Sequence, residues 1–184
     1  MKKQERGLKH RVIESHYIHK RPWLTARCER LEMADGRIIP EYYVLEYPDW
    51  VNTIAITKDG RYIMTYQYRH ALQVSEYELC SGVCEDGEDP IDAARRELEE
   101  ETGYTGGKWS HLMTISANPS TQNNLVHCYV ARDVELTSER HLDPTEELEV
   151  HLLTRDEVIE LLKTNSILQA THIAPLWRFI AEEK

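Results

Sequence analysis

Apolar and polar residues alternate along most of residues 10–47, which is the pattern of half-buried β-strands. Leu24, Ala26 and Cys28 fall on one side of an extended chain, and the polar residues between them fall on the other. An Asp35-Gly36 turn signal separates two of these stretches, 30–34 and 38–45. The pattern therefore predicts a β-rich segment at the start of the chain.

The remaining strands are predicted from shorter apolar runs. A hairpin is expected from 53–57 and 62–68, because Asp59-Gly60 lies between them as a turn signal. Later candidates are 109–115, 125–131 and 149–153.

Capping residues mark two helices. Asp89-Pro90 is a typical helix start and Gly103 a typical end, which predicts a helix over 90–102. Its apolar stripe is Ile91, Ala94 and Leu98. A capping box, Thr154-Arg155-Asp156-Glu157, starts a second helix that runs to about Lys163.

A third helix is predicted over 169–182, where Pro175 should bend or interrupt it. Strands and helices are mixed along the chain, and the pairing signals are mostly antiparallel. This combination predicts an α+β fold, arranged as a layered sandwich.

Composition is that of an ordinary globular protein. The 184 residues are 41% hydrophobic and 29% charged, which excludes wholesale disorder. No run approaches the ~18 apolar residues of a membrane-spanning helix. The charged first residues lead into no apolar run, and the four cysteines form no Cys-x-x-Cys pair. We therefore expect a cytoplasmic protein with free thiols and no membrane association.

The net charge of −10 is concentrated in one segment. Residues 85–101 carry nine acids and two arginines, a net charge of −7. Such a segment repels polyanions, so nucleic acid is an unfavourable partner. Glu97, Glu100 and Glu101 crowd one face of the predicted helix, roughly opposite its apolar stripe. That face is either solvated or a site for a hard cation such as Mg²⁺.

A spaced motif runs through the same segment. Gly82 is followed after five residues by Glu88, and after seven more by Arg96-Glu97-Leu98-Glu99-Glu100-Glu101-Thr102-Gly103-Tyr104. The spacing matches the Nudix box, G-x5-E-x7-R-E-U-x-E-E-x-G-U with U hydrophobic, at every fixed position. Tyr104 stands where U is usually aliphatic. The chain thus resembles the Nudix family, and the resemblance favours a cation site over a solvated face.

The resemblance implies a Nudix-type α/β/α sandwich with a mixed sheet over 46–184, preceded by a small β extension over 1–45. It also implies Mg²⁺ as cofactor, with Mn²⁺ as a substitute. The implied metal ligands are Glu97, Glu100, Glu101 and the carbonyl of Ser81. The residues with an implied structural role in the motif are Gly82, Glu88, Arg96 and Gly103.

Segments outside the box resemble the ADP-ribose pyrophosphatase subgroup, namely 67–69, 78–82 and Pro119. The loop 120–124 departs from that subgroup because it lacks an acid. The substrate contacts that the resemblance implies are Arg69 as a phosphate clamp, Trp50 stacked on a nucleobase, and Glu78. The alternatives are a surface salt bridge for Arg69 and core packing for Trp50.

The general base must come from another segment, because the amides at 122–124 accept no proton at neutral pH. In the subgroup, a glutamate in the loop before the last strand swings toward the metal ions. Glu146 falls at that position here, and Glu147 alternates to the other side. Glu100 and Glu101 are the further catalytic candidates, and the alternative for Glu146 and Glu147 is that both are ordinary solvated charges.

Histidine and cysteine give no competing site. The nine histidines form no zinc-like set with the cysteines, and His127 and His151 are interpreted as structural residues. Cys80 and Cys84 have no evident base, so we interpret them as packing or loop residues.

We expect a Mg²⁺-dependent hydrolase of the pyrophosphate bond in a nucleoside diphosphate derivative, first of all ADP-ribose or a related nucleotide sugar. The alternatives are GDP-mannose, NADH, a dinucleoside polyphosphate or coenzyme A as substrate, or a non-catalytic nucleotide-binding regulatory module. Residues 1–45 are too few for a core of their own. In the subgroup this region forms a homodimer, which we expect here as well.

Overall fold

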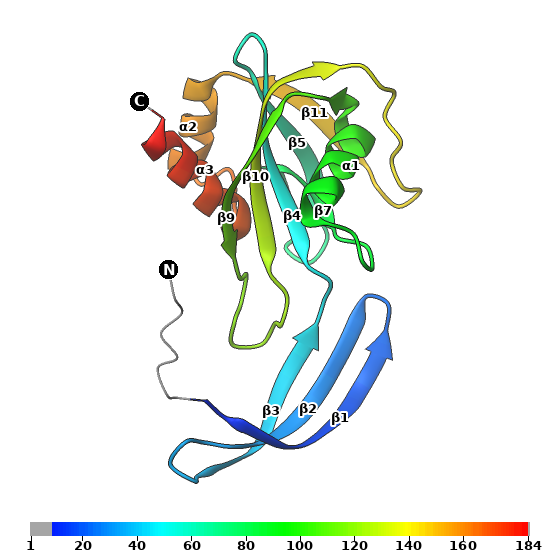
Figure 1. Ribbon diagram of the computed structural model, residues 1–184. Helices are drawn as coiled ribbons and strands as arrows, with labels where there is room; N and C mark the ends of the chain where they lie inside the picture. Colours follow the sequence, from blue (N-terminus) through cyan, green and yellow to red (C-terminus); the bar gives the residue numbers. More distant parts are fainter. Residues whose placement is uncertain (1–8, 184) are drawn as a thin grey trace. The chain divides into compact units, whose positions relative to one another are not determined.

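The N-terminal segment forms a three-stranded antiparallel sheet in the order β1-β2-β3 in the computed structural model, which describes residues 9–183 (Figure 1). The strands are β1 (Arg11–Arg21), β2 (Leu24–Glu32) and β3 (Ile38–Glu46). Residues 1–8 of the expected extension lie outside the described residues. The loop Asn118–Asn124 belongs to the same compact unit, because the backbone of Leu45 donates to Thr121 (2.7 Å) and accepts from Asn123 (3.3 Å).

The second unit, 48–117 with 125–183, is built on an eight-stranded mixed sheet with the central order β11-β5-β4-β10-β8. Only β4 and β10 run parallel among the paired strands described. Short strands β6, β7 and β9 pair with β5, β4 and β10. The bounds are β4 (Trp50–Thr57), β5 (Tyr62–Arg69), β6 (Val74–Glu78), β7 (Cys80–Val83), β8 (Tyr104–Thr105), β9 (Lys108–Ile115), β10 (Val126–Leu136) and β11 (Leu148–Leu153).

Helices cover both faces of this sheet (Figure 1). α1 (Pro90–Thr102) lies on one face, and α2 (Arg155–Lys163) and α3 (Ala170–Glu182) lie on the other. The alternation of β4 explains the two cores, because Ile54 and Ile56 pack with α2 and α3 whereas Ala55 packs with the α1 side. The predicted α+β sandwich with a mixed sheet is confirmed.

The predicted interruption of the third helix is wrong, since α3 continues through Pro175. A proline inside a helix leaves the carbonyl four residues earlier without its usual donor. Here that carbonyl belongs to Thr171, and the Asn52 side chain of β4 donates to it instead (2.8 Å). The sheet therefore supplies the hydrogen bond that the proline cannot.

Three short strands were not expected from the sequence. β6, β7 and β8 are two to five residues long, too short to show a clear alternation. Cys80 accordingly lies in a strand rather than a loop, and it is fully buried. No helix of residues 9–183 is long and apolar enough to cross a membrane.

Candidate functional site

The helix α1 begins and ends where its capping residues predict. The Asp89 side chain accepts a hydrogen bond from the backbone of Ile91 (3.1 Å), and Pro90 occupies the first helical position. Gly103 ends the helix in the left-handed conformation (φ 76°), which costs a residue without a Cβ little. Both ends of the acidic helix are therefore fixed by local chemistry.

The acidic side chains do not lie opposite the apolar stripe, so that expectation is wrong. Glu97 and Glu101 are buried together with Ala94 and Leu98. With about 100° between successive residues, the side chain of Glu101 leaves the helix in nearly the same direction as that of Ala94. The side chain of Glu97 lies slightly further round the helix on the same side. Two carboxylates thus face the sheet, and Glu100 stays partly exposed at the edge.

Gly82 on β7 makes room for one of these carboxylates. A Cβ at this position would lie 2.0 Å from the carboxyl carbon of Glu97, far inside van der Waals contact. The absence of a side chain in the motif glycine therefore lets the Glu97 carboxylate approach the strand. We call the space that Gly82 leaves for this carboxylate the Gly82 cradle. It holds Glu97 against β7, as a metal ligand must be held.

Burial raises the pKa of both buried acids. The pKa of Glu97 rises to about 7 and that of Glu101 to about 8, in each case mainly because burial disfavours the charged form. The backbone N–H of Ser81 donates to Glu101 (3.2 Å), which opposes the shift. Two carboxyl groups buried on the same side of a helix are neutralised either by protons or by a cation, and their oxygens are the ligands that suit Mg²⁺.

Arg96 supplies a positive charge to this cluster in the structure. Its guanidinium donates to Glu88 through two nitrogens (3.1 and 3.0 Å), to Glu97 (2.8 Å) and to Glu100 (3.0 Å). It also donates to the carbonyl of Val83 (3.0 Å). In this arrangement, no three His, Cys, Asp or Glu side chains of residues 9–183 are placed to hold a metal ion.

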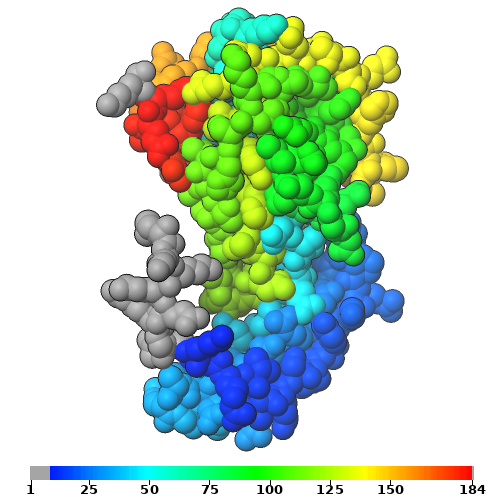
Figure 2. Space-filling view, in the orientation of Figure 1, coloured from blue at the N-terminus to red at the C-terminus, as the bar shows by residue number. Residues whose placement is uncertain are grey.

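The loop before β11 is tied to the end of α1. The Arg140 guanidinium donates to the carbonyls of Glu101 (2.9 Å) and Leu148 (2.8 Å), and the backbone of His141 donates to the carbonyl of Glu100 (2.9 Å). The carbonyls of Glu100 and Glu101 belong to the last turn of α1 and have no partner inside the helix, and a cation is favourable there. The space-filling view shows α1 and this loop, bright green and yellow, on the same face of the larger unit (Figure 2).

Glu146 lies in this loop, and its charge reaches the buried acids. Its carboxylate adds a small contribution to the rise in pKa of both Glu97 and Glu101, which comes mainly from burial and, to a lesser extent, from the neighbouring glutamates Glu100 and Glu97. The side chain is exposed and accepts a hydrogen bond from the backbone of Asp143 (3.0 Å). The charge of Glu146 therefore acts on the buried acids from the loop before β11.

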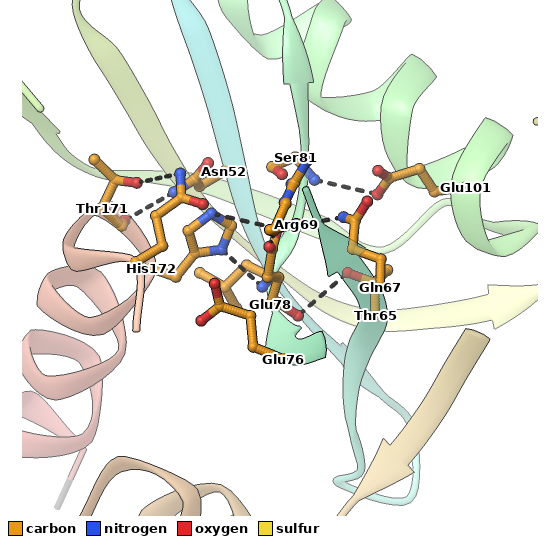
Figure 3. Close-up of polar contacts among 12 residues, drawn as sticks. Asn52, Thr65, Gln67, Arg69, Glu76, Glu78, Ser81, Glu101, Thr171 and His172 are labelled. Atoms are coloured by element: carbon orange, nitrogen blue, oxygen red, sulfur yellow. Dashed lines mark hydrogen bonds and ion pairs between the residues drawn. The ribbon is translucent and has the colours of Figure 1, made fainter. Parts of the chain in front are cut away.

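Arg69 at the end of β5 and Glu78 at the end of the neighbouring strand β6 form an ion pair (Figure 3). The Glu78 carboxylate is completely buried, and the Nε of Arg69 donates to it at 2.6 Å. Gln67 donates to the same carboxylate (3.2 Å). The Arg69 side chain is 42% exposed. Arg69 can thus reach a ligand, whereas Glu78 sits beneath it.

The remaining sequence candidates lie near the strand ends. Trp50 begins β4 and is partly buried, with its backbone N–H on the carbonyl of Leu125 (2.8 Å). His127 contacts Asp49 through a 2.9 Å hydrogen bond, and His151 contacts Glu149 at 3.1 Å. Sequence reasoning missed Arg140 and His172, because an arginine in a loop and a histidine in a helix carry no motif.

Comparisons with known proteins fit this geometry. The NUDIX domain model matches residues 47–174, and the model of the nucleoside diphosphate sugar hydrolase N-terminal domain matches residues 11–45. The chain is 29% identical to the ADP-ribose pyrophosphatase of Bacillus subtilis (strain 168), over 90% of this chain and 89% of that protein. It is 30% identical to the methanol dehydrogenase activator of Bacillus methanolicus, over 85% of each.

A solved structure has the same fold. The crystal structure of an ADP compounds hydrolase superposes with a TM-score of 0.82 at 22% identity, over 94% of this chain and 93% of that one. The Nudix model covers well over half of the chain, and it includes the buried acids, their glycine cradle and the loop of Glu146. The chain therefore belongs to the Nudix family of pyrophosphohydrolases.

Proposed function

We propose that the protein hydrolyses the pyrophosphate bond of a nucleoside diphosphate sugar, with ADP-ribose as the lead substrate. One observation carries the proposal. The buried carboxylates of Glu97 and Glu101 lie where α1 meets β7, and the loop before β11 brings a third carboxylate, that of Glu146, within electrostatic reach. This constellation has metal-binding acids and a separate, exposed acid that can accept a proton.

Glu97, Glu100, Glu101 and the carbonyl of Ser81 are the residues that would hold Mg²⁺ or Mn²⁺. A bound ion would neutralise pyrophosphate oxygens and lower the pKa of water. All four donors are oxygens, and the Gly82 cradle and the high pKa of the two buried acids support this assignment. The family is typically dependent on a divalent metal, in agreement with this donor set.

Glu146 is our proposed general base. It is exposed, so its carboxylate is available to take a proton from an attacking water, and its charge acts on the buried acids. Glu100 and Glu101 remain the alternative acceptors. Arg69 is our proposed phosphate contact, since a guanidinium binds phosphate oxygens in a planar fork. Glu78 then acts on Arg69 rather than on the substrate, and Trp50 is the proposed surface for the nucleobase.

The relatives support the substrate class. Proteins named ADP-ribose pyrophosphatase in Bacillus subtilis, Mycobacterium tuberculosis and Saccharomyces cerevisiae are 29–35% identical over the aligned regions. The acid-free loop 120–124 leaves the sugar and base open. We propose a homodimer formed through residues 1–45, as the apolar side chains exposed on the small sheet indicate.

A substrate panel tests the proposal. Purified protein is incubated with ADP-ribose, GDP-mannose, NADH, diadenosine polyphosphates and coenzyme A, with and without Mg²⁺, and the nucleoside monophosphate is measured. We expect Mg²⁺-dependent release of AMP from ADP-ribose above all others. Tight nucleotide binding without turnover on any member would instead favour a regulatory role, such as the name of the Bacillus methanolicus relative describes.

A further inference from the structure

The first turn of α3 is fastened to the strands beside the metal-ligand segment. The backbone N–H of Leu168, just before the helix, donates to the buried carboxylate of Glu76 on β6. Inside the helix, the Nδ1 of His172 accepts a hydrogen bond from the backbone N–H of Leu79 (2.9 Å), at the junction of β6 and β7 (Figure 3). Neither Glu76 nor His172 belongs to the Nudix box.

The hydrogen bond to Leu79 fixes the protonation of His172. Because Nδ1 accepts from an N–H, it carries no proton, so the neutral ring carries its proton on Nε2. The residue is 0% exposed, and burial together with the charge of Arg69 lowers its pKa to about 3. The imidazole is therefore neutral throughout the physiological range, with one acceptor side and one donor side.

The donor side of His172 faces the ion pair that orients Arg69. Its Nε2 lies 3.9 Å from the Oε2 of Glu78, beyond hydrogen-bond range, and has no hydrogen-bond partner among residues 9–183. Glu78 is fully buried and binds the guanidinium of Arg69. The Nε2–H is therefore a buried donor without a hydrogen-bond partner among residues 9–183, and it lies beside a buried carboxylate. The ring thus packs against the carboxylate that binds Arg69.

The acceptor side of His172 holds the backbone that leads to the metal ligands. Leu79 stands two residues before Ser81, whose N–H donates to the buried carboxylate of Glu101 (3.2 Å). Asn52, which also holds the carbonyl of Thr171, pairs with Ser81 in the sheet. Two contacts from one helical turn therefore converge on the start of β7.

We propose that His172 is a positioning residue with two separate roles, in which Nδ1 fixes the Ser81 segment for the metal ion and Nε2–H fixes the Glu78–Arg69 pair for the substrate phosphate. This inference rests on the proposed function of the site. A buried histidine that only fills space would show no such division, because any change of its shape would disturb both roles through stability alone.

Two substitutions separate the roles. His172→Asn places an amide oxygen near the position of Nδ1 and removes the Nε2–H. We expect the KM for the substrate to rise about tenfold while the Mg²⁺ affinity stays near the wild-type value. His172→Gln reaches the Nε2 position but loses the acceptor for Leu79. We expect the dissociation constant for Mg²⁺ to rise about tenfold, with a smaller change in KM.

The control is Leu176→Ala, one turn further along α3 in the core. It should lower the melting temperature at least as much as either histidine variant, with KM and Mg²⁺ affinity unchanged. Mg²⁺ affinity is measured by calorimetry, which requires no turnover. If the wild type turns over no substrate, the proposed function fails, whereas the calorimetric difference between the two variants still tests His172.

Nitrogen NMR of the wild type tests the tautomer without any variant. Long-range ¹H–¹⁵N spectra of histidine-labelled protein should show one ring with a bare Nδ1 and a protonated Nε2, unchanged from pH 5 to pH 8 as its burial requires. A ring protonated on Nδ1 would overturn the proposal. So would equal effects of His172→Asn and His172→Gln on both KM and Mg²⁺ affinity.

Discussion

Charge is the property that matters most at the scale of the single residue, and Glu100 offers the cleanest test. Its side chain is 41% exposed, and its carboxylate forms an ion pair with the guanidinium of Arg96 at 3.0 Å. Glu100→Gln keeps the size and helix propensity of the residue and removes one of the proposed metal ligands. We expect turnover to fall at least about 100-fold, because metal ions contribute several kcal/mol of charge stabilisation.

The melting temperature of this variant should stay close to that of the wild type without Mg²⁺, because the exposed pair with Arg96 contributes little to stability. Glu99→Gln is the matched control, since Glu99 is exposed one position earlier on the same helix. It should leave both turnover and melting temperature unchanged. Turnover of Glu100→Gln within threefold of the wild type would contradict the metal assignment.

A second prediction at this scale concerns pH. The pKa values of Glu97 and Glu101, about 7 and about 8, lie above the ordinary value of 4.5. The folded protein therefore binds these protons more tightly than the unfolded chain does. Their contribution to stability is complete below about pH 4.5 and is lost as the pH rises through 7 to 8.

Without Mg²⁺, the melting temperature should therefore decrease between pH 6 and pH 9. Added Mg²⁺ should stabilise the protein more at pH 8.5 than at pH 6, because the ion binds deprotonated carboxylates. Differential scanning fluorimetry across this range measures both effects. Glu101→Gln should flatten the slope. A wild-type melting temperature that rises with pH, or an equal gain from Mg²⁺ at both ends, would contradict the assignment of these two groups.

At the scale of the element, the sequence predicts helix ends better than helix orientation. The caps at Asp89 and Gly103 are local chemistry, so the bounds of α1 could be predicted from the residues alone. The burial of Glu97 and Glu101 could not, because a carboxylate enters the interior only where the sheet leaves room. For Glu97 that room comes from Gly82 on β7, a short strand that the pattern did not reveal.

The loop before β11 shows the same limit. Its sequence offers two adjacent glutamates; alternation puts them on opposite sides, and only the resemblance to the subgroup favours Glu146 over Glu147. The contacts that hold the loop come from Arg140 and His141, which bind the last carbonyls of α1. No local pattern indicates such long-range partners. The interruption expected at Pro175 is wrong for the same reason, since the donor that compensates for the proline lies on β4.

Glu146→Gln tests the role of this loop. If Glu146 accepts the proton, the substitution should lower kcat by about 100-fold or more and change KM little, because an amide cannot accept a proton. Glu147→Gln is the matched control in the same loop, and it should change little. Steady-state kinetics at saturating Mg²⁺ measures both. The reverse pattern would make Glu147 the base, and no effect from either would direct attention to Glu101.

At the scale of the whole molecule, the chain folds into two compact units, and the smaller unit includes a segment that is distant in the sequence. The small sheet takes in the distant loop Asn118–Asn124, which joins it through backbone hydrogen bonds to β3. Such bonds leave no signature in side-chain periodicity, so the β-strands of the N-terminal segment could be predicted and the added loop could not. The match of this segment to a nucleoside diphosphate sugar hydrolase N-terminal domain agrees with its strand pattern.

This small sheet leaves several large apolar side chains exposed in a single chain. Its buried apolar residues are only Cys28, Leu31 and Val44 among those described. Its exposed large apolar residues outnumber them: Val12, Tyr17, Ile18, Trp23, Leu24, Ile38 and Tyr43. Contiguous apolar patches on soluble proteins mark interaction sites, and a three-stranded sheet has little core of its own. A second copy of the chain would bury this surface.

We therefore predict a homodimer at micromolar concentration that depends on this sheet. Ile18→Lys places a charge on a side chain that is 55% exposed in the single chain, so it should shift the protein to a monomer without lowering the melting temperature of the larger unit. Ser15→Lys, at an exposed polar position of the same strand, is the control and should remain dimeric. Multi-angle light scattering measures the mass of each. If the dimer also completes the nucleotide site, the Ile18→Lys monomer should have a raised KM with its Mg²⁺ affinity unchanged; a wild-type monomer at micromolar concentration would refute the prediction.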